Sequence, residues 1–317
     1  MARYLLGRLV VSSISLVLVV VIVFVAVRLM PGDIVDQFFQ DTGARPGQAE
    51  ELREKLGLSD PIAVQFWRYL GELARGDLGE SLASGRELSV VIRDRTPVTF
   101  QLAMMTLIFS LAIGLPLGVL SAVMRGSPFD YLLRTIAIGG ISIPFFWIAV
   151  LTISLPAYYW RWTPPIGHVP LQEDPLASIQ HMLAPALVGT VFLAGSIMRM
   201  LRATMLEVLR LDYMRTAAAK GLSRATQIRR HALRNALIPV VTLIGIRFIF
   251  LLSGSVVLES IYALPGLGQL SLDALSRRDY QVVQAVTLFM AVIIIMTNLV
   301  VDISYGFIDP RIRHSRA

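Results

Sequence analysis

Long apolar runs separated by polar segments dominate this 317-residue chain. A bilayer core about 30 Å thick needs about 20 apolar residues of helix for one crossing. Six runs reach this length: 9–29, 98–123, 135–158, 182–200, 237–258 and 282–307. With 55% hydrophobic and only 16% charged residues, the chain is too apolar for a water-soluble globular protein. The pattern predicts an all-α, polytopic membrane protein with six transmembrane helices.

The first apolar run allows two interpretations. Arg3 and Arg8 give it a basic start, and the small residues of FVAV could form a cleavage site, as in a secretory signal peptide. The run is longer than the roughly 7–15 residues of a signal-peptide core. We therefore expect a retained transmembrane helix.

The charged residues between the runs predict the orientation. If the N-terminus is inside, the inner segments (1–8, 124–134, 201–236 and 308–317) hold 15 Lys and Arg against 4 Asp and Glu. The outer segments (30–97, 159–181 and 259–281) then hold 11 against 17. Because Lys and Arg concentrate on the cytoplasmic side, both termini should be cytoplasmic. The positive charge lies beside membrane segments, so the pI near 10.0 does not indicate nucleic-acid binding.

The first outer segment, 30–97, is long enough to fold. A short helix is expected near 50–56, and Asp60-Pro61 is a suitable N-cap and first helical residue for a second helix. Apolar residues recur at helical spacing behind this pair: Ile62, Phe66, Leu70 and Leu73. Two interpretations stay open, an amphipathic cap on the bilayer or on neighbouring helices, and a docking surface for an external partner.

Glycine and proline interrupt several of the predicted spans. Gly114 and Gly118 flank Pro116, and small residues at this spacing favour close helix packing, although a flexing point is the alternative. Pro144 lies inside the third run. So many helix breakers are typical of a bundle that changes shape.

Polar residues inside the runs are candidates for function, because a charge in the bilayer needs a partner or a water-filled cavity. Arg247 lies mid-way along the fifth run, and Asn298 and Asp302 lie one turn apart in the sixth. Arg247 could pair with Asp302, face the aqueous pathway, or meet a lipid headgroup or another subunit.

Sites for catalysis are missing from the sequence. There is no cysteine, and the two lysines, Lys55 and Lys220, do not follow the glycine spacing of a nucleotide-binding loop. The four histidines are scattered, and no G-x-S-x-G elbow exists. We expect no catalytic residue, no metal site and no cofactor on this chain. A secondary carrier remains an alternative, but no clear internal repeat supports it; an intramembrane hydrolase and a passive scaffold are weaker ones.

The basic stretch between the fourth and fifth runs, within 201–236, has a helical pattern. Gly221 can adopt a positive φ and end a first helix over about 211–220, and Ser223 can cap the next. Three alanines, Ala217, Ala218 and Ala219, would allow close approach of another surface. The stretch could bind lipid phosphates, or it could seat in a cytoplasmic motor.

This stretch resembles the EAA coupling loop of permease subunits in binding-protein-dependent ABC importers. Aligned on Gly221, Ala217 takes the last alanine of the motif and Leu233 its leucine. This sequence departs from the motif at four positions: Arg215 for the glutamate, Thr216 for the first alanine, His231 for the isoleucine and Arg234 for the proline. YMRTAAAKGLS and RRHALRNALIPVVT are similar to the variant found in the first ("B") permease of the dipeptide, oligopeptide and nickel branch.

Further stretches carry the same resemblance, among them LMPGD, LGLSDPIAVQFWRYLGELARGDLGESL, TPVTFQLA, ISIPFFWIAV, LESIYALPGLGQL, RRDYQVVQAV and DPRIR. The resemblance implies a type I ABC importer permease with the MetI-like fold, in a bacterial or archaeal cytoplasmic membrane. It implies a heterodimer with a homologous second permease, two cytoplasmic ATPase subunits that bind ATP and Mg²⁺, and an extracytoplasmic substrate-binding protein.

The resemblance also implies which parts of the chain do what. Residues 1–29 would form the first helix, 30–97 the extracytoplasmic segment, 98–307 the permease core and 308–317 a cytoplasmic tail. The coupling loop would use Arg215–Gly221 (Lys220 included), His231, Leu233 and Arg234. Di- or oligopeptides are the expected cargo, with nickel, glutathione or oligosaccharides as alternatives.

Overall fold

The structure is a computed structural model that describes residues 2–29, 53–54, 57 and 59–308. The long helices are α1 (Ala2–Leu29), α5 (Leu88–Val123), α8 (Pro175–Val208), α11 (Leu233–Ile261) and α13 (Tyr280–Ile308). Shorter helices connect them: α4 (Ile62–Ala74), α6 (Pro128–Ser142), α7 (Phe145–Trp160), α9 (Asp212–Ala219), α10 (Arg224–Thr226), the π-helix η1 (Gln227–Ala232) and α12 (Leu267–Ser276). The predicted all-α class is confirmed.

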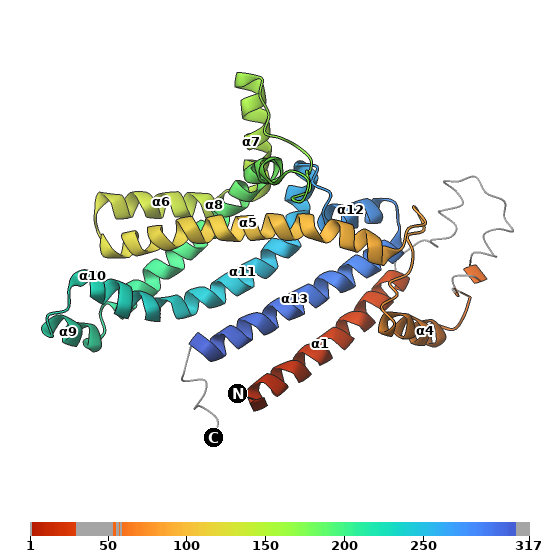
Figure 1. The fold of residues 1–317 in the computed structure, drawn as a ribbon, viewed down its shortest axis with the longest axis horizontal. Helices are drawn as coiled ribbons and strands as arrows, with labels where there is room; N and C mark the ends of the chain where they lie inside the picture. The colour runs from red at the N-terminus through yellow and green to blue at the C-terminus, as the bar shows by residue number, and fades with distance from the viewer. Residues whose placement is uncertain (1, 30–52, 55–56, 58, 309–317) are drawn as a thin grey trace.

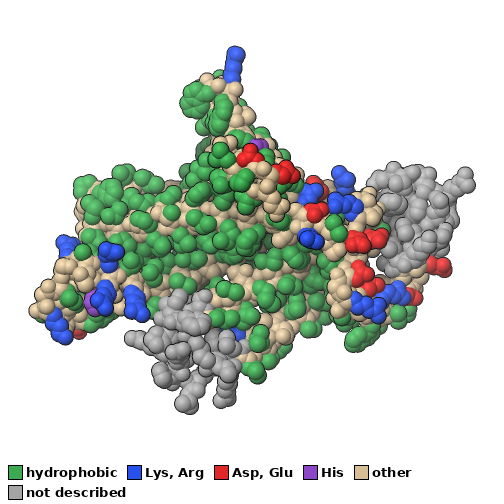
Figure 2. Space-filling model, in the orientation of Figure 1, with side chains coloured by type: hydrophobic (Ala, Val, Ile, Leu, Met, Phe, Trp, Pro, Cys, Tyr) green, Lys and Arg blue, Asp and Glu red, His purple; other side chains and the backbone are tan. Residues whose placement is uncertain are grey.

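The long helices form one slanted bundle. α5 and α8 pack along each other, α11 lies against α8, and α1 lies along α13 (Figure 1). The loop end of the bundle carries α9 and α10, and the opposite cap end carries α4 and α12. A band of apolar surface lies between the two ends, with basic side chains gathered at the loop end (Figure 2). This distribution suits a protein that crosses a bilayer from one end to the other.

Small residues bring α5 and α8 together. A Cβ atom on Gly114 would lie 2.9 Å from the backbone oxygen of Ala194, and one on Gly118 would lie 3.0 Å from Cβ of Leu201. Contacts this short leave no room for a side chain, so the packing interpretation of this glycine pair is confirmed. The helix continues through Pro116 up to Val123.

The third predicted span, 135–158, is not one helix. It divides into α6 and α7, which meet at an angle of 95°. Ile143 is extended at φ −83° and ψ 128°, because the residue before a proline is driven out of the helical region. Pro144, which has no N–H to donate, then precedes α7. Among the described residues, five helices are long and apolar enough to cross a membrane, and the bent pair makes a sixth crossing if it counts as one span.

Two other boundaries differ from the sequence prediction. α5 begins at Leu88, ten residues before the predicted second span, and its 36 residues are about 54 Å long. That length exceeds a bilayer core, so the first turns of α5 belong to the cap end. α4 begins at Ile62 without a side-chain cap, because the Asp60 carboxylate binds Arg68 instead. Of the short helix expected over 50–56, only Arg53 and Glu54 lie within the described residues, and both are helical.

The amphipathic helix α4 packs on the bundle. The ring of Phe66 meets Phe24 of α1 edge-on, with centroids 5.0 Å apart, and Tyr69 stacks on the same ring at 5.7 Å. Arg28 Nε donates to Oε1 of Gln65 at 3.0 Å. These contacts favour the cap interpretation of the outer segment, and the packing of α1 along α13 favours a retained first helix.

A buried carboxylate joins α11 to α5 and α12 at the cap end. Glu259 is fully buried, and it accepts hydrogen bonds from Thr99 Oγ1 at 2.7 Å and from the backbone N–H of Gln269 at 3.0 Å. Gln269 lies in the first turn of α12, where free N–H groups and the helix dipole favour a carboxylate. Thr99 Oγ1 also accepts the Leu267 N–H at 2.9 Å. The sequence LESIYALPGLG therefore forms a closed, hydrogen-bonded corner.

Candidate functional site

The basic stretch folds as two helical pieces joined at Gly221, as the sequence predicts. α9 ends in a Schellman motif: Gly221 N–H donates to Ala218 O at 3.0 Å, and Leu222 N–H donates to Ala217 O at 3.3 Å. Gly221 has φ +77°, a conformation that favours glycine. These bonds satisfy carbonyls at the end of α9 and fix the direction in which the chain leaves it.

The second piece begins at Ser223 and leads directly into α11. Ser223 Oγ accepts the Thr226 N–H at 3.3 Å, which is the predicted N-cap. Gln227 Nε2 donates to Leu222 O at 2.7 Å and ties the turn to this piece. The π-helix η1 follows over Gln227–Ala232, and its i→i+5 bonding adds a residue to the turn before α11.

The loop is fastened to the bundle by apolar contacts. Met214 of α9 and Ala232 and Ala236 of the following helices are buried in one cluster with Leu201 and Met205 of α8. A second tie is polar, because Asn235 Nδ2 donates to the Tyr213 hydroxyl at 2.9 Å. The loop therefore packs into the apolar core at the loop end of the bundle.

Most of the predicted coupling residues lie on the surface. The exposed ones are Arg215, Thr216, Ala218, Ala219, Lys220, Gly221 and Arg234. Ala217 is only 7% exposed, so it packs inward, and of the three alanines only Ala218 and Ala219 offer a small-residue surface. His231 and Leu233 are partly buried, and Leu233 packs against the α8 cluster. The motif thus divides between positions that fold the loop and positions that face outward.

Arg215, which replaces the glutamate of the motif, has an acidic neighbour on its own helix. Its Nη1 lies 3.2 Å from Oδ1 of Asp212, one turn earlier. Both side chains are at least 80% exposed, and an exposed pair of this kind contributes little stability. The guanidinium is therefore free to exchange Asp212 for an external carboxylate at small cost.

One ion pair near the loop was not predicted from the sequence. Asp130, at the start of α6, is 1% exposed and accepts from both Nε and Nη2 of Arg202 on α8 at 2.8 Å. Ser121 Oγ and the Gly126 N–H complete its hydrogen bonds at 2.6 and 3.0 Å. The signal was the S-x-x-D capping pattern that Ser127 and Asp130 form, which places the acid in the first turn of a helix.

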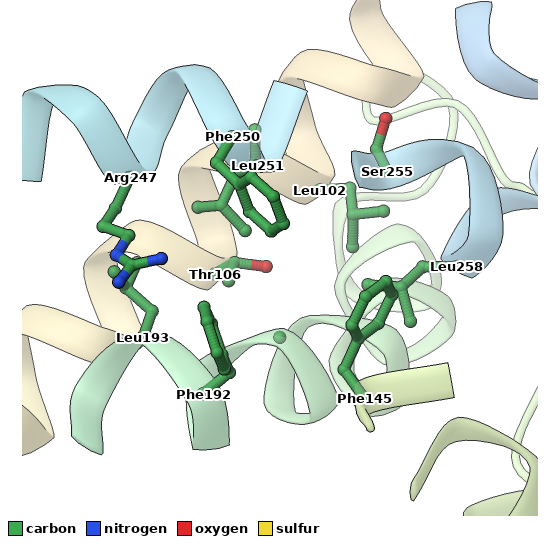
Figure 3. A pocket seen from close by; sticks show the side chains of 12 residues that line it. Leu102, Thr106, Phe145, Phe192, Leu193, Arg247, Phe250, Leu251, Ser255 and Leu258 are labelled. Atoms are coloured by element: carbon green, nitrogen blue, oxygen red, sulfur yellow. The ribbon is translucent and has the colours of Figure 1, made fainter. Parts of the chain in front are cut away.

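The polar residues inside the spans do not gather into one site. Asp302 pairs with Arg8 of α1 at 3.2 Å, so of the three alternatives for Arg247 the tie to Asp302 is replaced by one between α1 and α13. Asn298 is exposed on α13. Arg247 instead lines a cavity between α5, α7, α8 and α11, with its guanidinium 5.1 Å from the ring centroid of Phe192 (Figure 3).

The described residues offer little for chemistry. Within this part of the chain, no three His, Cys, Asp or Glu side chains come together in a way that could hold a metal ion. What the geometry provides is a shaped, basic loop at one end of a membrane bundle and a small cavity inside it. A loop of this shape can bind a partner and transmit its motion to the helices, and a cavity can bind a small molecule or group.

Comparison with known proteins decides the family. Residues 114–314 match the family of binding-protein-dependent transport system inner membrane components, and residues 1–103 match the N-terminal region of such membrane components. The chain belongs to this family. It is accordingly a multi-pass inner membrane protein and a transport subunit, not an ATPase, as the resemblance of its loop implied.

Similar proteins extend over the whole chain. The dipeptide transport system permease protein DppB of Escherichia coli K12 is 40% identical and covers 100% of both chains. The di/tripeptide transport system permease protein DppB of Pseudomonas aeruginosa is 41% identical over 94% of this chain and 95% of its own. A putative peptide transport system permease protein of Brucella abortus is 39% identical over the same shares.

Solved structures confirm the predicted fold. A chain of the inward-facing MetNI methionine ABC transporter superposes with a TM-score of 0.55 at 23% identity, over 69% of this chain and 96% of that one. A chain of an amino acid ABC transporter crystallised with histidines gives a TM-score of 0.53 at 13% identity, over 70% and 94%. The fold is therefore that of a type I importer permease.

Proposed function

We propose that this family member is the permease subunit of an ATP-driven peptide importer and that α9 and α10 form its contact with an ATPase subunit. The observation that carries the second part is the shape of the loop. Gly221 and Ser223 fix two short helices at one end of the bundle, and buried side chains join them to α8 and α11. A rigid, exposed element of this kind can pass a movement of a motor to the membrane helices.

The charge distribution supports a cytoplasmic position for this loop. The inner segments are strongly basic in the predicted topology, and the loop end carries the basic side chains in Figure 2. Both termini would then also be cytoplasmic, in a bacterial or archaeal membrane. Further partners in the proposal are a homologous second permease that completes the pathway, two ATPases that hold ATP and Mg²⁺, and an external substrate-binding protein.

Di- or oligopeptides are the proposed cargo. The support is that relatives at 39–41% identity, aligned over nearly the entire chain, are described as peptide permeases. A binding protein generally selects the substrate in such systems, so nickel, glutathione and oligosaccharides are the competing cargoes to test. A secondary carrier would need neither ATPase nor binding protein.

Reconstituted vesicles test the function. The two permeases, the ATPases and the binding protein are incorporated with ATP, and uptake of a labelled dipeptide is measured with each component omitted in turn. We expect uptake only from the complete set, with unlabelled dipeptide competing and nickel, glutathione and maltotriose failing to compete. Uptake without the ATPases would show a carrier, and competition by another cargo would replace the peptide assignment.

The contact at Arg215 is tested by charge reversal. Because Arg215 can release Asp212 at small cost, Arg215→Glu should reduce ATP-driven uptake about tenfold by facing an ATPase carboxylate with a like charge. Reversal of that ATPase acid to lysine should restore most of the uptake. Arg125→Glu changes another exposed arginine, which lies in the turn between α5 and α6 and outside α9 and α10, and it is the matched control. Failure of the two reversals to rescue each other would refute the pairing.

A further inference from the structure

The cavity beside Arg247 contains two polar groups without partners. Arg247 Nε and Thr106 Oγ1 are both buried, and neither has a hydrogen-bond partner among the described residues. Both line the same cavity, Arg247 from α11 and Thr106 from α5 (Figure 3). Leaving a buried hydrogen-bond donor without an acceptor costs free energy. Two such donors in one cavity therefore indicate that an acceptor from another molecule binds there.

The charge of the cavity selects the chemistry of that group. Of the twelve residues that line it, Arg247 alone is charged, and most of the others are apolar. The ring of Phe192 lies under the guanidinium at 5.1 Å and holds it in place without neutralising it. In such apolar surroundings an arginine gains most from a carboxylate, which can accept from two of its N–H groups.

The size of the cavity limits how much of a ligand enters. The cavity itself has a volume of only about 30 Å³, within a hollow of about 520 Å³ that includes its open mouth. A single water molecule needs roughly 10–15 Å³ of such a cavity. The interior therefore suits the two oxygens of a carboxylate, while the rest of a larger molecule would remain in the mouth.

We propose that Arg247 and Thr106 form a binding point for the carboxylate of the transported substrate, which for a peptide is its free C-terminus. This rests on the proposed function, since a peptide importer must pass this group through the bundle. The Thr106 hydroxyl donates a second hydrogen bond to the carboxylate. A carboxylate of the second permease has the same chemistry and is the competing source.

The test uses the complex of both permeases and the ATPases in nanodiscs. The binding protein is left out, so that the ligand binds only in the transport pathway. Equilibrium binding of labelled dialanine is compared with that of dialanine amide, which differs in the terminal carboxylate. We expect wild type to bind dialanine at least about tenfold more tightly. Arg247→Gln should bring that ratio close to one with the affinity for the amide unchanged, and Arg247→Lys should keep an intermediate ratio.

Two further variants complete the design. Thr106→Val, which keeps the side-chain shape, should weaken dialanine binding several-fold. Arg199→Gln removes an exposed charge of α8 outside the cavity and should leave the ratio as in wild type. An equal preference in wild type and Arg247→Gln, or no preference in wild type, would overturn the proposal. Loss of the second permease from the Arg247→Gln complex during size exclusion would assign the carboxylate to that subunit and also overturn it.

The outcome is separable from that of the proposed function. If wild-type vesicles take up no dipeptide with the complete set of components, the cargo assignment fails whatever Arg247 binds. If they take up dipeptide and the amide binds equally well, only the role of Arg247 fails.

Discussion

The ion pair of Asp130 with Arg202 should be the strongest single polar contact at the loop end. The carboxylate is 1% exposed and accepts four hydrogen bonds, two of them from the guanidinium at 2.8 Å. Removing one partner of a buried pair leaves an uncompensated charge and costs about 3–5 kcal/mol. Because Arg202 is 18% exposed, water can reach part of it, and we expect the lower end of this range for Asp130→Asn.

The assay is thermal unfolding of the purified chain in detergent, followed by tryptophan fluorescence. At about 2 °C per kcal/mol for a chain of this size, Asp130→Asn should lower Tm by about 6 °C. Arg202→Met should cost a similar amount. The double variant should lose clearly less than the sum of the two, because removing the second partner also removes the orphaned charge. Arg134→Gln, an exposed arginine on the same helix, should change stability by less than about 0.5 kcal/mol. Additive losses would refute the reasoning.

Three further predictions concern packing, the cap end and pH. Gly114→Ala should destabilise by about 1–3 kcal/mol, because its Cβ would meet a backbone oxygen of α8, whereas Gly139→Ala, with open space around it, should be neutral or stabilising; Tm of both variants checks this. Thr99→Val should cost about 2 kcal/mol and speed proteolysis near α12, because it breaks the bond to Glu259 and orphans a buried N–H. Burial lowers the pKa of His168 below 6.5 in the folded protein. The neutral imidazole therefore contributes to the free energy of unfolding fully above pH 6.5, and this contribution is lost as the pH falls towards the lowered pKa. Tm of wild type should therefore fall more between pH 7 and 5 than Tm of His168→Gln, and equal slopes would contradict this.

The sequence predicted the helices and the turn chemistry because these depend on neighbouring residues. Apolar runs located the spans, Gly221 located the end of α9 and Ser223 the start of α10, each through a local backbone requirement. The glycine pair at 114 and 118 predicted close packing in the same way. Which helix it packs against was not local information, and only the structure identifies α8.

Tertiary contacts account for what could not be predicted. Asp302 has Arg8 as its partner at the other end of the sequence, and nothing in the spacing distinguished this from a pairing with Arg247, which was one of the alternatives left open. The proline in the third run signalled a possible break, but the 95° angle depends on what α6 and α7 pack against. The alanine-rich composition predicted that Ala217 would lie on the surface, but the orientation of α9 buries its side chain.

The two candidate sites share the same helices, and this connects the loop to the cavity. α8 carries Met205 under the loop and Phe192 in the cavity, 13 residues or about 20 Å apart along the axis. A rigid tilt of α8 by about 10° would move one site by about 3 Å relative to the other, the length of a hydrogen bond. α11 is different, because Pro239 lies between Ala236 and Arg247 and removes a backbone hydrogen bond where a bend can absorb the motion. The stiffer connection from the proposed ATPase contact to the proposed carboxylate site is therefore α8, and the side of the cavity that it moves is the wall formed by Phe192 beneath the guanidinium.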